Sequence, residues 1–321
     1  MSEPVQTVLD AAGEEVGRLL ARAELRMLEL SGGHGPVLSD HAGATIAAGG
    51  KRLRPLLVCL AAGVPVRESD ALVCAAVAVE LIHAATLVHD DVLDGSDLRR
   101  GRPTVVASAG RLAATATGDL LFSRAFAELA GTGSVPSVRV LSRASSQLAR
   151  GELMQRADAW NPRVSVERYL ERCRLKTAVL FRSACELGAI HGGGEVATLG
   201  GFGETIGLAF QLFDDVLDVT GPPERTGKPR GADLLDGTVT LPLILARQLD
   251  ADLAALDPRS VLTAEQAAAV CDRIAASGGL AGARERAMAM VERAKASLPS
   301  LPDRQRAALE LVADGVVDRY A

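Results

Sequence analysis

The stretch Asp70–Asp94 reads DALVCAAVAVELIHAATLVHDDVLD and carries the strongest structural signal in the chain. It is apolar almost all the way round a helical repeat, which predicts a helix buried in the middle of a bundle. Its last turn carries Asp90 and Asp94 four residues apart, so both carboxylates project from one face. A second copy, DDVLD at Asp214–Asp218, ends another apolar stretch. Two buried helices that end in paired carboxylates predict a cavity with an acidic rim.

The carboxylates of the two motifs require positive partners. Carboxylates one turn apart repel one another, and an apolar setting makes the repulsion stronger unless cations are bound. Oxygen ligands in small number on separate helices are typical of Mg²⁺, which keeps several waters and is usually shared with substrate phosphates. Each motif alone could instead be a solvated acidic face of a helix. The return of the same five letters with the same apolar insertion favours a metal site.

Basic clusters accompany the acidic motifs. In GGKRLRP, at Gly49–Pro55, two glycines allow a ligand to approach the backbone, and three cations follow at a predicted helix start. The segment LRRGRPT comes directly after the first acidic motif, although on its own it could be a solvated loop paired with Asp94 and Asp97. Only four of the 35 basic residues are lysines, and three of these lie in motifs. A lysine is a compact point charge that suits phosphate, whereas a lone lysine in a helix more often snorkels at the surface. The four lysines are Lys51, Lys176, Lys228 and Lys295.

The balance of charges indicates the class of ligand. Carboxylates for about three divalent ions accompany about six to eight cationic side chains, which is more than one phosphate monoester requires. Two polyphosphate groups would use this set, one bound through metal and one bound mainly by arginine and lysine. The residues that precede both acidic motifs are largely Ala, Leu, Val and Phe, so the rest of the ligand should be apolar. An apolar tail on a diphosphate head is an isoprenoid diphosphate.

Composition favours an all-α protein, and the length of the chain fits either two domains or one large helical domain. The chain has 321 residues, of which 48% are hydrophobic and 3% aromatic, so the core must consist of Ala, Leu and Val in closely packed helices. Helical periodicity continues without a linker, which predicts a single domain over residues 1–321, with about 10–13 helices around a central apolar cavity. The expected helices cover residues 4–30, 37–49, 52–63, 68–94, 103–130, 135–157, 165–190, 194–219, 238–256, 263–277, 279–298 and 303–320.

Other classes of protein fit the composition poorly. A net charge of −5, without a basic stripe interleaved with aromatic residues, argues against nucleic acid as a partner. The longest uncharged run, Pro55–Val66, is too short for a membrane helix of roughly 20 residues, and the first residues lack the pattern of a signal peptide. The five cysteines are scattered and are expected to be reduced core residues. We therefore expect a cytoplasmic protein without a transmembrane segment.

Seven motifs follow one another between about Gly49 and Pro242, and their order is distinctive. They are GGKRLRP, ELIHAATLVHDDVLDGSDLRRGRPT, GDLL, LKTAVLF, QLFDDVLD, TGKPRGADL and DGTVTLPLI. This set resembles the trans-polyprenyl diphosphate synthase family, in particular its bacterial long-chain members. The resemblance implies the all-helical isoprenoid synthase fold, a homodimer and prenyltransferase activity. The reaction would be a Mg²⁺-dependent head-to-tail condensation of isopentenyl diphosphate with an allylic diphosphate, which could be dimethylallyl, geranyl or farnesyl diphosphate.

The resemblance also implies roles for the residues of each motif. Mg²⁺, about three ions, would be bound by Asp90, Asp94 and Asp214, with Asp91, Asp215 and Asp218 in support. The allylic diphosphate would be held by Arg99, Lys176, Thr177, Gln211 and Lys228. Isopentenyl diphosphate would be bound by Lys51, Arg54, His83 and Arg100. The catalytic set would be Asp90, Asp94, Lys176, Thr177, Gln211 and Asp214. His83 could instead be a packed core histidine, but it lies two turns before Asp90 on the same helical face.

The expected chemistry follows from the charges. Metal ions and cationic side chains neutralise the departing diphosphate, so that the allylic C–O bond ionises to a delocalised carbocation. An apolar pocket protects this cation from water. The double bond of isopentenyl diphosphate then attacks it, and loss of a proton gives a product five carbons longer. Because His89 adjoins the metal motif and no other side chain in the motifs is an obvious base, we expect the released diphosphate to take the proton.

Product length should depend on the residues one and two turns before Asp90, where the growing tail descends. Short-chain relatives are known for bulky aromatic residues four or five places before the first aspartate, where this chain has the small Thr86 and Ala85. We expect a product longer than farnesyl, in the C30 to C45 range, with geranylgeranyl (C20) or farnesyl (C15) diphosphate as alternatives. Phe122 on the following helix could shorten the pocket. The pocket residues are Leu81, Ile82, Ala85, Thr86 and Phe122.

One departure and three alternatives remain open. One alternative is a structural protein that binds divalent ions, which would not require Lys176 or Lys228. Thr238 stands where many relatives have a lysine that helps to bind diphosphate, so this chain would have one cation fewer. A class I terpene cyclase would share the fold and the first aspartate motif, but it would have no use for GGKRLRP. A non-catalytic subunit of a heteromeric synthase would normally have lost one acidic motif, and both are present here.

Overall fold

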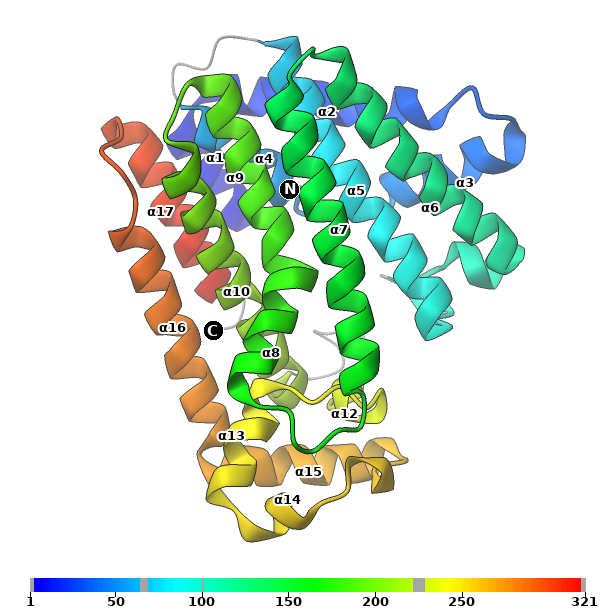
Figure 1. The fold of residues 1–321 in the computed structure, drawn as a ribbon, viewed down its shortest axis with the longest axis vertical. Helices are drawn as coiled ribbons and strands as arrows, with labels where there is room; N and C mark the ends of the chain where they lie inside the picture. The colour runs from blue at the N-terminus through cyan, green and yellow to red at the C-terminus, as the bar shows by residue number, and fades with distance from the viewer. Residues whose placement is uncertain (1–2, 64–68, 100, 222–228, 319–321) are drawn as a thin grey trace. The chain divides into compact units, whose positions relative to one another are not determined.

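The computed structural model describes residues 3–63, 69–99, 101–221 and 229–318, and it confirms that these residues are almost entirely helical. The first helices are α1 (Glu3–Ala12), α2 (Glu14–Ser31), α3 (Pro36–Ala47), α4 (Leu53–Ala62), α5 (Asp70–Asp94) and α6 (Val105–Gly131). They are followed by α7 (Val135–Asp158), α8 (Val166–Cys173), the π-helical turn η1 (Arg174–Ala178), α9 (Val179–Gly192) and α10 (Val196–Thr220). The remaining elements are α12 (Ala232–Leu235), α13 (Leu241–Leu249), α14 (Ala251–Ala255), the 3₁₀ turn η2 (Pro258–Ser260), α15 (Ala264–Ser277), α16 (Gly279–Ala296) and α17 (Asp303–Asp318) (Figure 1).

The chain groups into two compact units, each assembled from several segments. Unit 1 comprises Met1–Ser145, Leu180–Gly203 and Leu298–Val312. Unit 2 comprises Ser146–Val179, Glu204–Ser297 and Ala313–Ala321. The single domain over residues 1–321 stays a prediction.

Most predicted helices occur within a few residues of their expected ends, and the differences have local causes. The helix expected at 4–30 is two helices, because Gly13 adopts a φ of 103° that interrupts the helical backbone. Between α5 and α6 the chain forms a short antiparallel hairpin of β1 (Leu98–Arg99) and β2 (Arg102–Pro103), which the sequence did not predict. The helix expected at 238–256 is also two helices, interrupted at Asp250, whose φ of −132° is extended rather than helical.

The core of unit 1 is built around α5, as the sequence predicts. This helix packs most extensively on α6 and also contacts α4 and α2, and Figure 1 shows α5 and α6 side by side. By length and composition alone α5 and α10 could cross a membrane, yet 72% of the apolar window of α5 and 56% of that of α10 are buried inside the protein. Packing within the protein therefore accounts for the apolar surface of α5.

Small residues let α9 approach α4 closely in the same unit. A Cβ atom built on Gly188 would lie 2.2 Å from the Val58 carbonyl oxygen, and one on Gly192 would lie 2.0 Å from that of Ala62. Real Cβ atoms do not approach that closely, so both positions require glycine in this packing. A core poor in aromatic residues depends on such short distances between helices.

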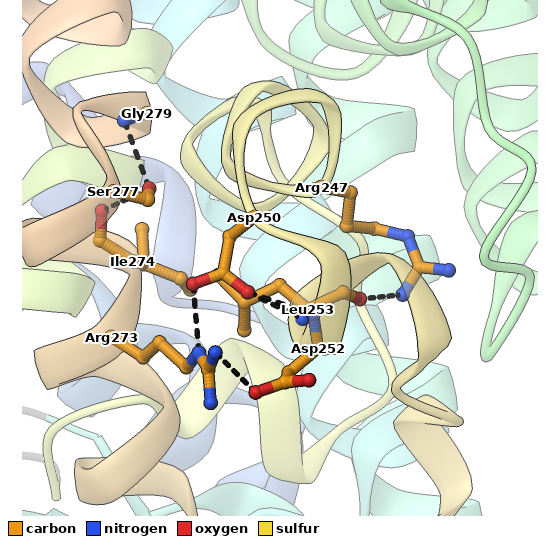
Figure 2. Close-up of polar contacts among 8 residues, drawn as sticks. All are labelled: Arg247, Asp250, Asp252, Leu253, Arg273, Ile274, Ser277 and Gly279. Atoms are coloured by element: carbon orange, nitrogen blue, oxygen red, sulfur yellow. Dashed lines mark hydrogen bonds and ion pairs between the residues drawn. The ribbon is translucent and has the colours of Figure 1, made fainter.

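In unit 2, α13 packs on α16, and the turn after α13 is fixed by Asp250 (Figure 2). The carboxylate of Asp250 accepts hydrogen bonds from the backbone N–H groups of Asp252 and Leu253, at 2.9 and 3.0 Å, and so caps α14. Its other oxygen accepts from Nε of Arg273 on α15, at 2.8 Å. The hydrogen bond from Arg273, followed by the one from Leu253, lowers the pKa of Asp250. The side chain of Asp250 therefore caps α14 and connects it to α15.

Replacement of Asp250 tests this arrangement. We expect Asp250→Ala to lower the melting temperature more than Asp252→Ala, because Asp252 contacts Arg273 but caps nothing. A carboxyl group whose pKa is lowered in the folded state stabilises the protein at pH values above its unfolded pKa of about 3.9 and loses this effect as the pH falls. The difference between Asp250→Ala and the native chain should therefore be present at neutral pH and shrink in acid. Equal melting temperatures for the two variants at neutral pH would contradict the assignment.

Candidate functional site

In unit 1, the segment GGKRLRP forms the turn that starts α4, and Arg52 holds this turn together. Arg52 lies in the left-handed region, with φ 48° and ψ 37°, which is unfavourable for a side chain with a Cβ atom. Its guanidinium donates from Nε and Nη2 to the two oxygens of Glu24, both at 2.7 Å, and from Nη1 to Glu80 at 3.1 Å. Nη2 also donates to the Ile46 carbonyl at 2.7 Å. Arg52 therefore connects α2, the end of α3 and α5 to the turn that carries Lys51 and Arg54.

The first acidic motif lies at the C-terminal end of α5, where the sequence places it. Gly95, with φ 63°, ends the helix in the left-handed conformation. Asp94 is exposed and Asp90 is half-buried, whereas Asp91 is only 5% exposed. One oxygen of Asp91 accepts from Nε and Nη2 of Arg99, at 2.8 and 2.7 Å. The structure thus brings Arg99 to the buried aspartate of the motif.

A cavity of about 130 Å³ lies beside α5 in unit 1. Its lining combines charged residues of α5 and the hairpin with small residues of α3, and it includes His83, Asp91, Arg99 and Arg102. Of the residues predicted to bind isopentenyl diphosphate, His83 lines this cavity, whereas Arg100 lies outside the described residues. The Arg54 guanidinium lies over the Phe181 ring, 4.9 Å from its centroid. Where isopentenyl diphosphate would bind stays a prediction.

The predicted chain-length residues lie on α5 and α6. Leu81, Ile82 and Ala85 are buried, and the half-buried Thr86 donates to the His83 carbonyl at 2.8 Å. Phe122 stacks on His89, with ring centroids 5.8 Å apart and an interplanar angle of 16°. The glycine of the GDLL motif, Gly118 on α6, lies against His89, because a Cβ atom there would lie 2.2 Å from Nε2 of His89 unless the ring moved. Phe122 is therefore adjacent to the first acidic motif through His89.

In unit 2, the LKT motif lies on the π-helical turn η1 rather than on a regular helix. Such turns expose backbone groups and frequently occur at functional sites. Lys176 donates to Glu152 of α7, with Nζ and Oε2 at 2.6 Å. The two helices approach closely at Gly151, where a Cβ atom would lie 2.7 Å from the backbone nitrogen of Lys176. Position 151 therefore places Glu152 against the predicted diphosphate-binding lysine.

The second acidic motif and the LKT motif are connected by a chain of hydrogen bonds in unit 2. Thr177 Oγ1 donates to Gln211 Oε1 at 2.7 Å, and Gln211 Nε2 donates to Asp215 Oδ1 at 2.9 Å. The other oxygen of Asp215 accepts from the hydroxyl of Tyr169 at 2.6 Å. Burial raises the pKa of Asp215 to about 7, against the effect of these hydrogen bonds, and burial also raises the pKa of Tyr169. Asp215 is thus held inside the protein on both of its oxygens.

The segment that follows the second acidic motif returns to it. The backbone N–H of Asp233 donates to Asp218 Oδ2 at 3.3 Å, and the N–H of Thr238 donates to the Asp233 carbonyl at 2.8 Å. Lys228 lies outside the described residues. Among the residues that the structure describes, no three His, Cys, Asp or Glu side chains are grouped closely enough to hold a metal ion by themselves.

Sequence reasoning did not identify several residues that hold these motifs in place. The Glu24 and Glu80 partners of Arg52 are far from it in sequence, and so is the Glu152 partner of Lys176. Tyr169 gave one available signal, because it is one of only two tyrosines in the chain and precedes the LKT motif by two turns. The structure connects this tyrosine to Thr177 of the LKT motif through Asp215 and Gln211.

Comparisons with known proteins agree on one family. The sequence profile of the family described as polyprenyl synthetase matches residues 36–271. The chain is 42% identical over 243 residues to heptaprenyl diphosphate synthase component 2 of Geobacillus stearothermophilus, covering 74% of this chain and 75% of that protein. It is 37% identical over 267 residues to octaprenyl diphosphate synthase of Escherichia coli (strain K12), with coverage of 80% and 82%. A crystal structure of a decaprenyl diphosphate synthase from Rhodobacter capsulatus has a TM-score of 0.90 and 34% identity, with coverage of 97% and 99%.

The close approach at Gly151 gives a prediction for stability. We expect Gly151→Ala to destabilise the protein by about 1–3 kcal/mol, because the methyl group meets backbone atoms that cannot move away independently. Gly17, inside α2, is the matched control, because no atom lies within 4 Å of the place where its added methyl group would stand. Gly17→Ala should be neutral or stabilising by up to about 1 kcal/mol. Urea unfolding measures both, and equal stability of the two variants would contradict the close approach.

Proposed function

Because this chain belongs to the polyprenyl synthetase family of prenyltransferases, we propose that it is a polyprenyl diphosphate synthase with a product longer than C15. It condenses isopentenyl diphosphate with an allylic diphosphate, adding five carbons in each cycle. The observation that carries this proposal is the pair of DDVLD motifs, each at the C-terminal end of an apolar helix, together with the family match. A terpene cyclase would not require GGKRLRP, which here has its own bonded support through Arg52.

We propose Mg²⁺ as the metal, bound by Asp90 and Asp94 in the first motif and by Asp214 in the second. The donor set fits this ion, because it consists of carboxylate oxygens that one or two residues supply from each helix. The helix dipole adds negative potential at the C-terminal end of α5, where Asp90 and Asp94 lie. When bound with substrate, the metal would neutralise charge on the departing diphosphate. Asp91 and Asp215 are held by Arg99 and by Tyr169 with Gln211, which supports a structural role for both.

The diphosphate-binding cations are proposed from the family motifs. For the allylic diphosphate they are Arg99, Lys176 and Lys228, with the polar side chains Thr177 and Gln211. For isopentenyl diphosphate they are Lys51, Arg54, His83 and Arg100. Lys176 and Arg99 now bond to Glu152 and Asp91, so a bound diphosphate would have to share or replace these carboxylates as partners. The absence of lysine at Thr238 makes the remaining cations more important for the allylic diphosphate.

The proposed chemistry is ionisation, condensation and elimination. Cationic side chains favour departure of diphosphate, and the allylic cation is attacked by isopentenyl diphosphate in an apolar pocket from which water is excluded. We propose that the released diphosphate takes the proton. His89 stacks on Phe122 and fills the space above Gly118, which favours a packing role over that of a general base. A variant of His89 or Thr177 that trapped the condensed cation would contradict this assignment.

The proposed product range is C30 to C45. Ala85 is fully buried on α5 and is small at a position where short-chain relatives have a bulky aromatic residue. The heptaprenyl and octaprenyl names of the relatives support this range, while C20 remains the nearest alternative because Phe122 lies beside His89. We also propose a cytoplasmic homodimer. A relative named as component 2 of its synthase raises a heteromeric enzyme as the alternative.

The direct test is incubation of the purified chain with farnesyl diphosphate, isopentenyl diphosphate and Mg²⁺, with product lengths read by mass spectrometry. We expect products in the C30 to C45 range from the chain alone. Products of C15 or shorter when geranyl diphosphate is the primer would contradict the long-chain proposal. Activity that required a second protein would establish the heteromeric alternative.

Substitution of Ala85 tests the path of the growing chain. We expect Ala85→Phe to shorten the main product, because a buried ring would block descent of the tail along α5. Leu81→Phe, one turn deeper, should allow a longer product than Ala85→Phe. Identical product lengths from the two variants and the native enzyme would show that the tail does not pass this face of α5.

A further inference from the structure

Unit 2 contains a continuous chain of hydrogen bonds that starts at a fully buried tyrosine and ends at a proposed substrate-binding residue. Tyr169 is 0% exposed and donates to Asp215, which is 3% exposed. Asp215 accepts from Gln211, and Gln211 accepts from Thr177. The three distances, 2.6, 2.9 and 2.7 Å, are those of well-formed hydrogen bonds. This chain of hydrogen bonds therefore connects α8, α10 and η1.

The direction of each hydrogen bond in this chain follows from the chemistry of its groups. The Tyr169 hydroxyl donates to one oxygen of Asp215 and the Gln211 amide N–H donates to the other, as they do when the carboxylate is ionised and can only accept. Because the amide nitrogen of Gln211 faces Asp215, its oxygen faces Thr177. A carbonyl oxygen cannot donate, so the hydroxyl of Thr177 must be the donor. The proton of Thr177 is thus directed into the protein.

We propose that Tyr169 is a positioning residue for the condensation reaction, acting through Asp215 and Gln211 to fix the orientation of Thr177. Asp215 is then the buried anchor of this chain and not a metal ligand. Thr177 offers its oxygen lone pairs to the substrate, so it does not hold the allylic diphosphate by donating a hydrogen bond. This inference rests on the proposed function for its kinetic consequences, but the hydrogen-bonded chain is a property of the fold.

Tyr169 is itself held from its other side. The guanidinium of Arg172 lies over the tyrosine ring, 5.4 Å from its centroid, and donates from Nη2 to the Val239 carbonyl at 2.6 Å. Arg172 is 3% exposed, and the carboxylate of Asp158 lies 3.8 Å from its Nη1. Val239 belongs to the motif DGTVTLPLI. Tyr169 therefore contacts Arg172, whose hydrogen bond to Val239 supports the motif DGTVTLPLI.

The alternative is that Tyr169 only fills space in the core. Tyr169→Phe would then lower stability without changing the balance between kcat and KM. A positioning role predicts a different result, because loss of one hydroxyl frees Asp215 and Gln211 to reorient. The effect should appear in kcat, since Thr177 is misdirected while the diphosphate-binding cations are untouched.

The experiment is a double-mutant cycle on the full-length enzyme with Tyr169→Phe and Thr177→Val. We expect each single variant to reduce kcat by about tenfold or more, with each KM within about threefold of the native value, and the double variant to be no worse than the poorer single variant within about twofold. Tyr169→Phe combined with Thr132→Val is the control, because the Thr132 hydroxyl bonds to the Leu129 carbonyl and takes no part in this chain. The control pair should be additive. Additive effects of Tyr169→Phe and Thr177→Val would overturn the proposal.

A second variant addresses the same claim without removing a hydrogen-bonding group. In Asp215→Asn we expect the amide oxygen to keep accepting from Tyr169 and the NH₂ group to face Gln211, which would then turn its oxygen toward it and its nitrogen toward Thr177. We expect kcat to fall as in Thr177→Val, while the Mg²⁺ concentration for half-maximal activity stays within about twofold. A tenfold or larger rise in that concentration would show that Asp215 binds metal. A tenfold rise in KM for the allylic diphosphate in Thr177→Val, with kcat unchanged, would show that Thr177 donates to the diphosphate.

Unfolding measurements separate failure of this inference from failure of the proposed function. The same double-mutant cycle, measured by urea unfolding, should show coupling between Tyr169→Phe and Thr177→Val whether or not the chain makes polyprenyl diphosphates. If the two substitutions are coupled in stability but the protein is inactive with isopentenyl diphosphate, the chain of hydrogen bonds is upheld and the proposed function is wrong. If the protein makes polyprenyl diphosphates but the two substitutions are coupled neither in kcat nor in unfolding, the proposed function is upheld and this inference is wrong.

Discussion

Carboxylates at the end of an apolar helix must find positive or donating partners, and this requirement shapes each of the two acidic motifs. In each DDVLD motif the second aspartate turns inward and is held by the protein. Asp91 accepts from Arg99, and Asp215 accepts from Tyr169 and Gln211. Neighbouring residues on a helix lie about 100° apart, so the first and fifth positions of each motif lie about 100° and about 60° from this buried partner, both on the same side of it. Burial of one carboxylate thereby sets the direction of the other two.

Hydrogen bonds from a side chain also hold the basic motif GGKRLRP in place. Arg52 has a left-handed backbone conformation, which costs roughly 1–2 kcal/mol. Its four hydrogen bonds, to Glu24, Glu80 and the backbone, offset this cost. A lysine could not replace it, because only the planar guanidinium reaches three groups in fixed directions. Glu80 is 5% exposed, so loss of Arg52 would leave a buried charge without its counter-ion. The first arginine of GGKRLRP is therefore structural, whereas Lys51 and Arg54 are the proposed ligands of the substrate.

Sequence reasoning predicted the features that depend on periodicity and local chemistry. The apolar period and the paired aspartates predicted that a buried helix ends at Asp94, and α5 ends there. Contacts between residues distant in sequence could not be predicted in this way. The hydrogen bonds of Arg52 to Glu24 and Glu80, and that of Lys176 to Glu152, were therefore missed. The π-helical turn at Lys176 was also missed, and its one extra residue rotates the residues that follow by about 100° about the helix axis. The roles of individual site residues stay proposals that were drawn from the family motifs.

The central claim is that the two acidic motifs hold an allylic diphosphate through Mg²⁺. It is tested most directly by calorimetric titration of the native chain and of Asp90→Asn with a non-ionisable farnesyl thiodiphosphate, with and without Mg²⁺. The account predicts tight binding to the native chain only when Mg²⁺ is present, and a loss of at least about tenfold in affinity, or 1.4 kcal/mol, for Asp90→Asn. Equal affinity of both proteins, or binding to the native chain that is unchanged when Mg²⁺ is removed, would contradict it.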